Sequence, residues 1–166
     1  RANLDLPPNV RVNDVLAGTT IAVAPRGDMI AFTSISVSGF QMFLRRVNEI
    51  SARQIGDGNV AGRNLAFSPD GRFLAFTEGN VLKKIAVDGG LISPLGTTGG
   101  SVPYGLTWSE TDTIYIGGFS GMWKVPGNGG DATPVGADDS ATVRLGRRWP
   151  YMLPDGKAVV FASGNS

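Results

Sequence analysis

The stretch Ser68-Pro69-Asp70-Gly71, followed by Arg72-Phe73-Leu74-Ala75-Phe76, decides the fold because it combines a tight turn with the strand that leaves it. Pro69 fixes φ at the start of the turn, Asp70 can hydrogen-bond to the local backbone, and Gly71 tolerates positive φ. A second apolar segment, residues 65–67, leads into the turn. Two apolar segments joined by such a turn predict a β-hairpin.

Two further short segments extend this hairpin into a larger unit. Residues 81–87 are expected to form a third, more polar strand after the turn at Gly79-Asn80. Residues 91–95 follow the Asp88-Gly89-Gly90 turn and are expected to form an edge strand, where Pro94 is tolerated. The sequence therefore predicts a four-stranded antiparallel sheet for the unit.

The unit recurs along the chain at a nearly constant interval. Pro25 and Pro69 lie 44 residues apart, Phe67 and Trp108 lie 41 apart, and Pro154 follows Pro69 by 85, which is two steps. The four corresponding segments are residues 21–32, 65–76, 106–116 and 151–161. A four-stranded unit repeated every ~40–50 residues is typical of the blades of a β-propeller.

The expected fold is therefore all-β, a partial β-propeller of about three and a half four-stranded antiparallel blades. We expect one domain over residues 1–166, with repeat units at approximately 17–60, 61–101, 102–144 and, in part, 145–166. Because propellers close with about four to eight blades, such a chain is either a fragment or is completed by association. Two copies would give about seven blades, which is an allowed number.

Composition narrows the possible chemistry. The 166 residues include no cysteine and no histidine, so the chain itself has no thiolate nucleophile, no Ser-His-Asp triad and no histidine metal ligand. The formal net charge of +1 gives no argument for nucleic acid or an anionic membrane, and no apolar run reaches ~18 residues. We therefore expect no enzyme activity, no catalytic residue, no metal, no cofactor, no nucleic-acid partner and no membrane insertion.

The acidic turn residues and the glycine pairs have a simpler interpretation than metal or phosphate binding. Asp70 and Asp155 each lie in a Pro-Asp-Gly turn that explains the aspartate, and Asp138-Asp139 lacks the ligand spacing of a calcium loop. No glycine-rich piece has the lysine and helix of a phosphate-binding loop. We expect hairpin turns at the glycine-rich pieces Gly89-Gly90, Gly99-Gly100, Gly117-Gly118 and residues 127–130.

The Ser-Pro-Asp-Gly-Arg signature at residues 68–72 resembles the TolB-like propeller repeats of bacteria, which are relatives of the WD-type repeats. The motif order also resembles the C-terminal propellers of bacterial serine/threonine protein kinases: Leu-Lys-Lys-Ile-Ala-Val-Asp-Gly-Gly at 82–90, Gly-Met-Trp-Lys-Val-Pro at 121–126 and Arg-Trp-Pro-Tyr-Met-Leu-Pro-Asp-Gly at 148–156. The resemblance runs from Leu4 to Phe161, although the first and third units lack the Pro-Asp-Gly turn. It implies a non-catalytic sensor or interaction module of a larger signalling protein, outside the cytoplasm.

A cluster of arginine and aromatic residues precedes the first strand of the fourth unit, and similar residues precede the first strands of the second and third. Blades are arranged radially, so these connections are expected to meet on one face around the central channel. Arginine pairs with carboxylates or phosphates, and aromatic side chains anchor contacts. The candidate binding residues are Arg63, Asn64, Tyr104, Arg147, Arg148 and Trp149. The alternative is that Trp149 packs between blades while the arginines are solvated or pair with nearby acids.

The expected function is binding of a protein or a small-molecule ligand. Two alternatives stay open at this point. One is an accessory propeller of a prolyl-oligopeptidase-like hydrolase, with the catalytic domain outside this chain. The other is a self-associating structural module, in which a homodimer completes the ring.

Overall fold

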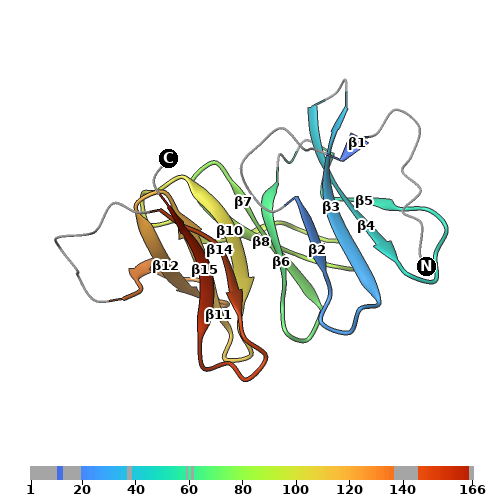
Figure 1. Cartoon of the computed structure of the whole chain (residues 1–166). Helices are drawn as coiled ribbons and strands as arrows, with labels where there is room; N and C mark the ends of the chain where they lie inside the picture. The colour runs from blue at the N-terminus through green and yellow to red at the C-terminus, as the bar shows by residue number, and fades with distance from the viewer. Residues whose placement is uncertain are drawn as a thin grey trace.

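Strands joined by turns account for all regular secondary structure in the computed structural model, which describes residues 11–12, 20–36, 39–58, 60, 62–136 and 146–164. The strands form three sheets that lie side by side, with the N-terminal sheet at one end and the C-terminal hairpin at the other (Figure 1). Across these ranges no helix is long and apolar enough to cross a membrane. The expected all-β architecture is confirmed.

The first sheet contains five antiparallel strands in the order β1-β3-β4-β5, and β2 pairs with β3 beside β1. The long strands β3 and β4 pair along their whole lengths. These strands are β1 (Arg11–Val12), β2 (Ile21–Val23), β3 (Met29–Ser36), β4 (Gly39–Arg46) and β5 (Arg53–Ile55).

The second sheet has four antiparallel strands in sequence order. It is the unit that the sequence predicts around the Ser68 turn, although its outer strand begins two residues later than expected. The strands are β6 (Arg63–Phe67), β7 (Phe73–Glu78), β8 (Val81–Ala86) and β9 (Ser93–Thr97).

The third sheet repeats this four-strand order and carries the C-terminal hairpin as well. One residue pair, Gly118 with Arg147, joins the hairpin to the sheet, so the start of the fourth unit is not a separate sheet. The four repeated strands are β10 (Pro103–Trp108), β11 (Thr113–Gly118), β12 (Gly121–Pro126) and β13 (Thr133–Pro134). The hairpin strands are β14 (Gly146–Met152) and β15 (Val159–Gly164).

The first strand of each unit lies next to the first strand of its neighbour. β2 contacts β6, β6 contacts β10, and β10 contacts β14 (Figure 1). These four inner strands therefore run around a shared axis, and the later strands of each unit lie progressively further from it. This arrangement brings residues about 40 positions apart in the sequence to neighbouring places on the molecule.

The turn at Ser68 forms as its sequence predicts. The N–H of Gly71 donates to the Ser68 carbonyl oxygen at 2.8 Å, and Gly71 has φ of 72°. Asp70 accepts hydrogen bonds from the Ser68 hydroxyl at 2.6 Å and from the Arg72 main-chain N–H at 2.9 Å. The aspartate therefore serves the turn, and these bonds hold β6 and β7 in register.

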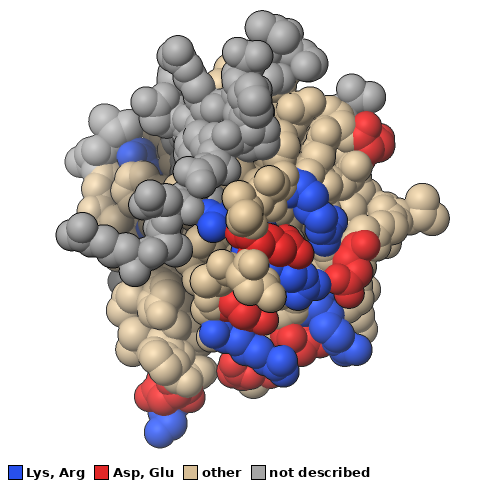
Figure 2. Space-filling view, turned by 90° about the vertical axis from the view of Figure 1, so that its right-hand side faces the viewer, with Lys and Arg blue, Asp and Glu red and all other residues tan. Residues whose placement is uncertain are grey.

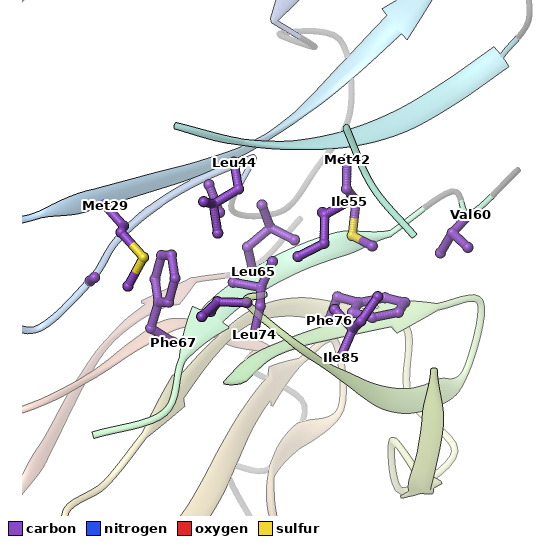
Figure 3. Packing of buried hydrophobic residues seen from close by; sticks show 13 residues of the cluster. Met29, Met42, Leu44, Ile55, Val60, Leu65, Phe67, Leu74, Phe76 and Ile85 are labelled. Carbon is purple, nitrogen blue, oxygen red and sulfur yellow. The ribbon is translucent and has the colours of Figure 1, made fainter. Parts of the chain in front are cut away.

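The space between the first and second sheets is filled by apolar side chains from both (Figure 3). Leu44 of β4 and Leu74 and Phe76 of β7 have no exposed surface. Burying a side chain of this size stabilises the fold by about 1.5–3 kcal/mol. A second cluster joins the second sheet to the third, and there Trp108 and Ile116 pack with Leu82. Packing between adjacent sheets thus provides the core.

Basic and acidic side chains are interspersed on the side of the molecule formed by the first sheet (Figure 2). One ion pair crosses between sheets, because the Arg46 guanidinium lies 2.9 Å from the Asp88 carboxylate. The mixture agrees with the net charge of +1 and leaves no single-sign field on this face.

One turn prediction is wrong. Gly117 and Gly118 belong to strand β11, and the turn that follows them contains Phe119 and Ser120. The reason is packing, because a Cβ on Gly117 would lie 2.5 Å from the carbonyl oxygen of Arg147 in β14. Glycine is needed there for close approach of two strands, and a glycine pair signals this as readily as it signals a turn.

Candidate functional site

Three of the four inner strands carry the same irregularity near their beginning. Strand pairing slips by one residue between Arg63 and Ala66 in β6, and comparable slips occur in β10 and β14. Each slip contains a residue with positive φ: Asn64 at 54°, Gly105 at 119° and Trp149 at 51°. These are β-bulges, which redirect side chains and are over-represented next to functional sites. The bulged segments contain all the candidate binding residues except Arg147, which directly precedes one.

The candidate residues therefore lie in strands and not in the connections that lead to them. Arg63 and Asn64 are the first two residues of β6, Tyr104 is the second of β10, and residues 147–149 lie inside β14. The prediction that these residues lie in connecting loops is therefore wrong. The physical reason is that the main chain at a bulge still pairs with the neighbouring strand on either side of the slip. A charged, aromatic segment gives no sequence sign of that pairing.

Asn64 has a structural role. Its side chain is buried, and its amide donates to the Thr77 hydroxyl at 2.9 Å and to the Pro103 carbonyl oxygen at 3.2 Å. Asparagine is one of the few residues that tolerate positive φ. Asn64 thus fixes the β6 bulge and ties the second sheet to the third, which leaves it unsuited to bind a ligand.

Arg63 and Arg148 each lie over aromatic rings. The Arg63 guanidinium carbon is 4.9 Å from the centre of the Phe40 ring in the first sheet. The corresponding atom of Arg148 is 4.9 Å from the Tyr104 ring and 4.9 Å from the Phe119 ring. The structure therefore brings Tyr104 and Arg148 together, as expected. Arg63 instead contacts the first sheet, away from these two residues.

Phe119 completes this arrangement and was not among the predicted residues. Its ring centre lies 5.7 Å from that of Tyr104 at 53°, so the two rings form an open wedge beneath Arg148. Phe119 is 40% exposed, in the turn between β11 and β12. A large apolar residue in a short turn is the available sequence signal, and a turn predicted at Gly117-Gly118 hides it.

Arg147 has a structural role, because its side chain and its main chain both contact the third sheet. Its guanidinium donates to the Val135 carbonyl oxygen at 2.7 Å and lies 5.3 Å from the Phe161 ring. Its main chain pairs with Gly118. Arg147 therefore anchors the hairpin β14–β15 to the third sheet, and its placement positions the adjacent Arg148.

Trp149 is 49% exposed, although its φ of 51° lies in a region that bulky residues rarely adopt. Strained backbone of this kind costs on the order of 1–3 kcal/mol and is concentrated at functional sites. The prediction that Trp149 is buried between blades, which was the alternative interpretation, does not fit this exposure. We call the surface formed by Tyr104, Phe119, Arg148 and Trp149 the arginine–aromatic face.

Two depressions lie at other places on the molecule. One of about 620 Å³ is lined by the inner strands of all four units, including Ile21, Ala66, Thr107 and Tyr151. Another of about 450 Å³ lies beside the Ser68 turn and is lined by Lys84, among others. Within the described ranges, no group of three acidic side chains gathers to hold a metal ion.

Comparison with solved structures identifies the architecture. The putative TolB of Agrobacterium tumefaciens matches 98% of this chain and 58% of its own, with a TM-score of 0.77 and 19% identity. TolB from Acinetobacter baumannii matches 86% of this chain and 37% of its own, with a TM-score of 0.67 and 16% identity. The fold is a partial β-propeller. The blade prediction is thereby confirmed, and this propeller segment spans only part of each similar chain. No protein-family model matches the sequence, and none of the curated proteins does.

The prediction that the chain is not an enzyme is contradicted by the comparison, because similar structures include enzymes. A gluconolactonase from Xanthomonas campestris is similar over 87% of this chain and 53% of its own, with a TM-score of 0.66 and 13% identity. Propellers of this shape thus include enzymes as well as binding proteins. At such low identity the likeness extends to the fold alone, so it transfers no catalytic residue to this chain.

Proposed function

We propose that this propeller segment is an interaction module that binds its partner at the arginine–aromatic face. The carrying observation is Trp149, a half-exposed tryptophan held at positive φ beside an arginine that lies on two aromatic rings. Tryptophan, tyrosine and arginine are the residues that most often dominate binding energy at interfaces. A rigid bulge presents them at little cost in side-chain freedom.

The biological setting follows from the resemblance of the motifs. Their order is similar to that in the C-terminal propellers of bacterial serine/threonine protein kinases, which supports a sensor role in a larger bacterial signalling protein. The same resemblance supports a location outside the cytoplasm, in the periplasm or at the cell exterior, as part of this proposal. Under this proposal the partner is a protein or peptide segment in that compartment.

A displayed library of random peptides tests the proposed face. The wild-type chain is panned first, and enriched peptides are measured against Arg148→Ala and Trp149→Ala. We expect each variant to lose about tenfold or more in affinity, which is the usual loss at a central interface residue. Leu91→Ala and Arg26→Ala are matched controls, because both side chains are exposed outside the face.

Circular dichroism of the four variants distinguishes loss of binding from loss of fold. Peptides that bind the wild type and both site variants equally would place the interaction elsewhere. Repeated selections in which no peptide is enriched would contradict the interaction role at this face. Either outcome can be interpreted, because circular dichroism and the Leu91→Ala and Arg26→Ala controls show whether the chain in the assay is folded.

Self-association is a second candidate function, and it rests on the two ends of the blade series. Ile21 and Val23 of β2 are 44% and 60% exposed, whereas Ala24 beyond them packs into the core with the second sheet. At the other end, Tyr151 of β14 and its cross-strand partner Val160 are 59% and 49% exposed. Each end thus presents an apolar inner-blade face of the kind that a neighbouring blade covers.

The occupant we assign to these ends is a second copy of the chain. In a two-fold arrangement, the first-sheet end of each copy covers the hairpin end of the other, and both ends are buried at once. Sedimentation velocity tests this directly, because Val23→Glu and Tyr151→Glu are each expected to give monomers. Mixing the two variants should restore partial dimerisation, since one of the two interfaces is then wild type. A wild-type chain that stays monomeric at all concentrations would exclude this candidate.

A further inference from the structure

Arg148 carries hydrogen-bond donors that nothing in the described part of the chain satisfies. A guanidinium has five N–H donors and no acceptor. The structure gives the Arg148 side chain two ring contacts, and among the described residues that side chain makes no hydrogen bond or ion pair. Its Nε is buried without a partner, and it is the sole such side-chain atom among the described residues. Leaving a buried donor unsatisfied is unfavourable, above all when the donor belongs to a charged group.

The packing around Arg148 holds this donor set in place. Its guanidinium carbon lies equally close to the Tyr104 and Phe119 rings, at 4.9 Å from each centre. The ring faces attract the cation, and the attraction is stronger where the cation is shielded from water. On the far side, a Cβ on Gly146 would lie 3.1 Å from Nε, so glycine makes room for the side chain. The arginine is thereby oriented before any ligand arrives.

The neighbouring charges favour a ligand with one negative charge. Arg147 already donates to the Val135 carbonyl oxygen, whereas among the described residues Arg148 is the cation of this face whose side chain makes no hydrogen bond and whose Nε is a buried donor without a partner. A carboxylate has the planar, two-oxygen shape that matches a guanidinium fork, and it carries a single charge. A phosphate dianion requires more than one cation for comparable neutralisation. The apolar rings beside the guanidinium further strengthen a hydrogen-bonded ion pair by excluding water.

We propose that Arg148 is a carboxylate-binding residue, which takes an acidic side chain or a C-terminal carboxylate of the partner while Trp149 contacts adjacent apolar groups. This inference rests on the proposed function for the location of the site, and it adds the chemistry of the ligand. Binding forms charge-assisted hydrogen bonds and breaks no covalent bond. Tyr104 and Phe119 act as positioning residues that orient the guanidinium.

Nuclear magnetic resonance of the arginine Nε–H groups tests this step with small probes. N-acetylglycine represents a C-terminal carboxylate, acetyl-glutamate amide represents an acidic side chain, and inorganic phosphate is the competing anion. We expect a saturable shift of the Arg148 signal with at least one carboxylate probe, at millimolar concentration. The probe that saturates first distinguishes the two sources, and the Arg26 and Arg72 signals serve as exposed controls.

Two variants separate orientation from charge. Arg148→Lys keeps the charge and loses the fork, so we expect it to weaken carboxylate binding about tenfold, followed through the indole N–H signal of Trp149 because this variant lacks the Arg148 Nε–H. Phe119→Leu keeps an apolar side chain and loses the aromatic face. The carboxylate concentration at half-saturation should therefore rise, while the Arg148 Nε–H signal remains observable. Saturation by phosphate in preference to both carboxylates would overturn the proposal, and so would the absence of any saturable shift. Peptides that bind at Trp149 without dependence on a carboxylate would overturn it while leaving the proposed function intact.

Discussion

The side-chain amide of Asn64 donates to the main-chain carbonyl oxygen of Pro103 at 3.2 Å and thereby ties two blades together at their inner strands. The same amide nitrogen also donates to the Thr77 hydroxyl at 2.9 Å, inside its own blade. Because Asn64 is buried at positive φ, one residue fixes the bulge and the packing of its neighbour. The arginine–aromatic face is built on the next two bulges around the axis.

Asn64→Asp should destabilise the chain at neutral pH. An ionised carboxylate cannot donate to Pro103, and leaving that contact unmade costs about 1–3 kcal/mol or more when the group is charged. Aspartate tolerates positive φ, so backbone strain does not contribute to this loss. Urea denaturation at a series of pH values measures it. The deficit should shrink as pH falls, because a protonated carboxyl donates again, and a deficit independent of pH would contradict this role for Asn64.

Asp70 should make the chain lose stability in acid. Hydrogen bonds from the Ser68 hydroxyl, then from the Arg72 main chain and side chain, lower the pKa of Asp70 from 3.8 to about 2. A lowered pKa means that the folded state prefers the ionised carboxylate, so the contribution is complete above about pH 4. It is lost as pH falls from about 4 towards 2. Carbon-detected titration of the Asp70 carboxyl measures the pKa directly.

Ser68→Ala is the sharpest control for this turn. It removes the hydroxyl that lowers the Asp70 pKa most, so that pKa should move up towards its ordinary value. Asp70→Asn should remove the acid-sensitive part of stability between about pH 4 and 2. A Ser68→Ala chain with an unchanged Asp70 titration would show that the hydroxyl does not act on the carboxylate.

Phe76→Ala should be among the most damaging changes in the core between the first two blades. The ring is completely buried and packs in the cluster that includes Met42 and Leu74. Truncation of such a side chain costs about 3–5 kcal/mol through lost burial and the cavity that remains. Leu91→Ala is the control, because Leu91 is 93% exposed and should change stability by less than about 0.5 kcal/mol. A comparable loss for both variants in thermal unfolding would contradict the packing shown in Figure 3.

Sequence periodicity was sufficient to predict the blades, because the Ser68 turn and its strands repeat local rules at a fixed interval. It was also sufficient to bring Tyr104 and Arg148 to one surface, since equivalent positions in a radial repeat lie close together. The roles of Asn64 and Arg147 were beyond its reach. Both side chains donate to main-chain carbonyl oxygens elsewhere in the chain, Asn64 to that of Pro103 in β10 and Arg147 to that of Val135 just after β13. The identity of the accepting residue does not reveal such a bond, because every residue has a main-chain carbonyl oxygen.

Phe119 is a site residue that the sequence could not predict, again because its position depends on a contact between distant segments. Its place beneath Arg148 depends on the turn that holds it, and the turn shifts by two residues once Gly117 and Gly118 are assigned to β11. That assignment follows from how closely β14 approaches, which is a distance between strands and not a local preference. The close approach of β14 to β11 therefore decides both where the turn lies and that Phe119 belongs to the arginine–aromatic face.

Gly117→Ala should disrupt the arginine–aromatic face without touching any of its side chains. A Cβ at this position would lie 2.5 Å from the Arg147 carbonyl oxygen and 2.7 Å from Cδ of Pro150, and both belong to the backbone or ring of β14. Neither group can rotate away, so the hairpin must shift outwards, at a cost of about 1–3 kcal/mol. Thermal unfolding measures this loss.

The Nε–H signal of Arg148 provides the second readout for Gly117→Ala. Gly164 of β15 is the matched control, because a Cβ there meets nothing within 4 Å and Gly164→Ala should leave stability and the site unchanged. In Gly117→Ala, the displaced β14 carries Arg148 away from the Tyr104 and Phe119 rings, so its Nε–H signal should lose the ring-current shift that those rings impose. Stability and signal should change together, because one strand contact sets both. An unshifted Arg148 signal in a destabilised Gly117→Ala chain would show that the face is held by the side chains alone.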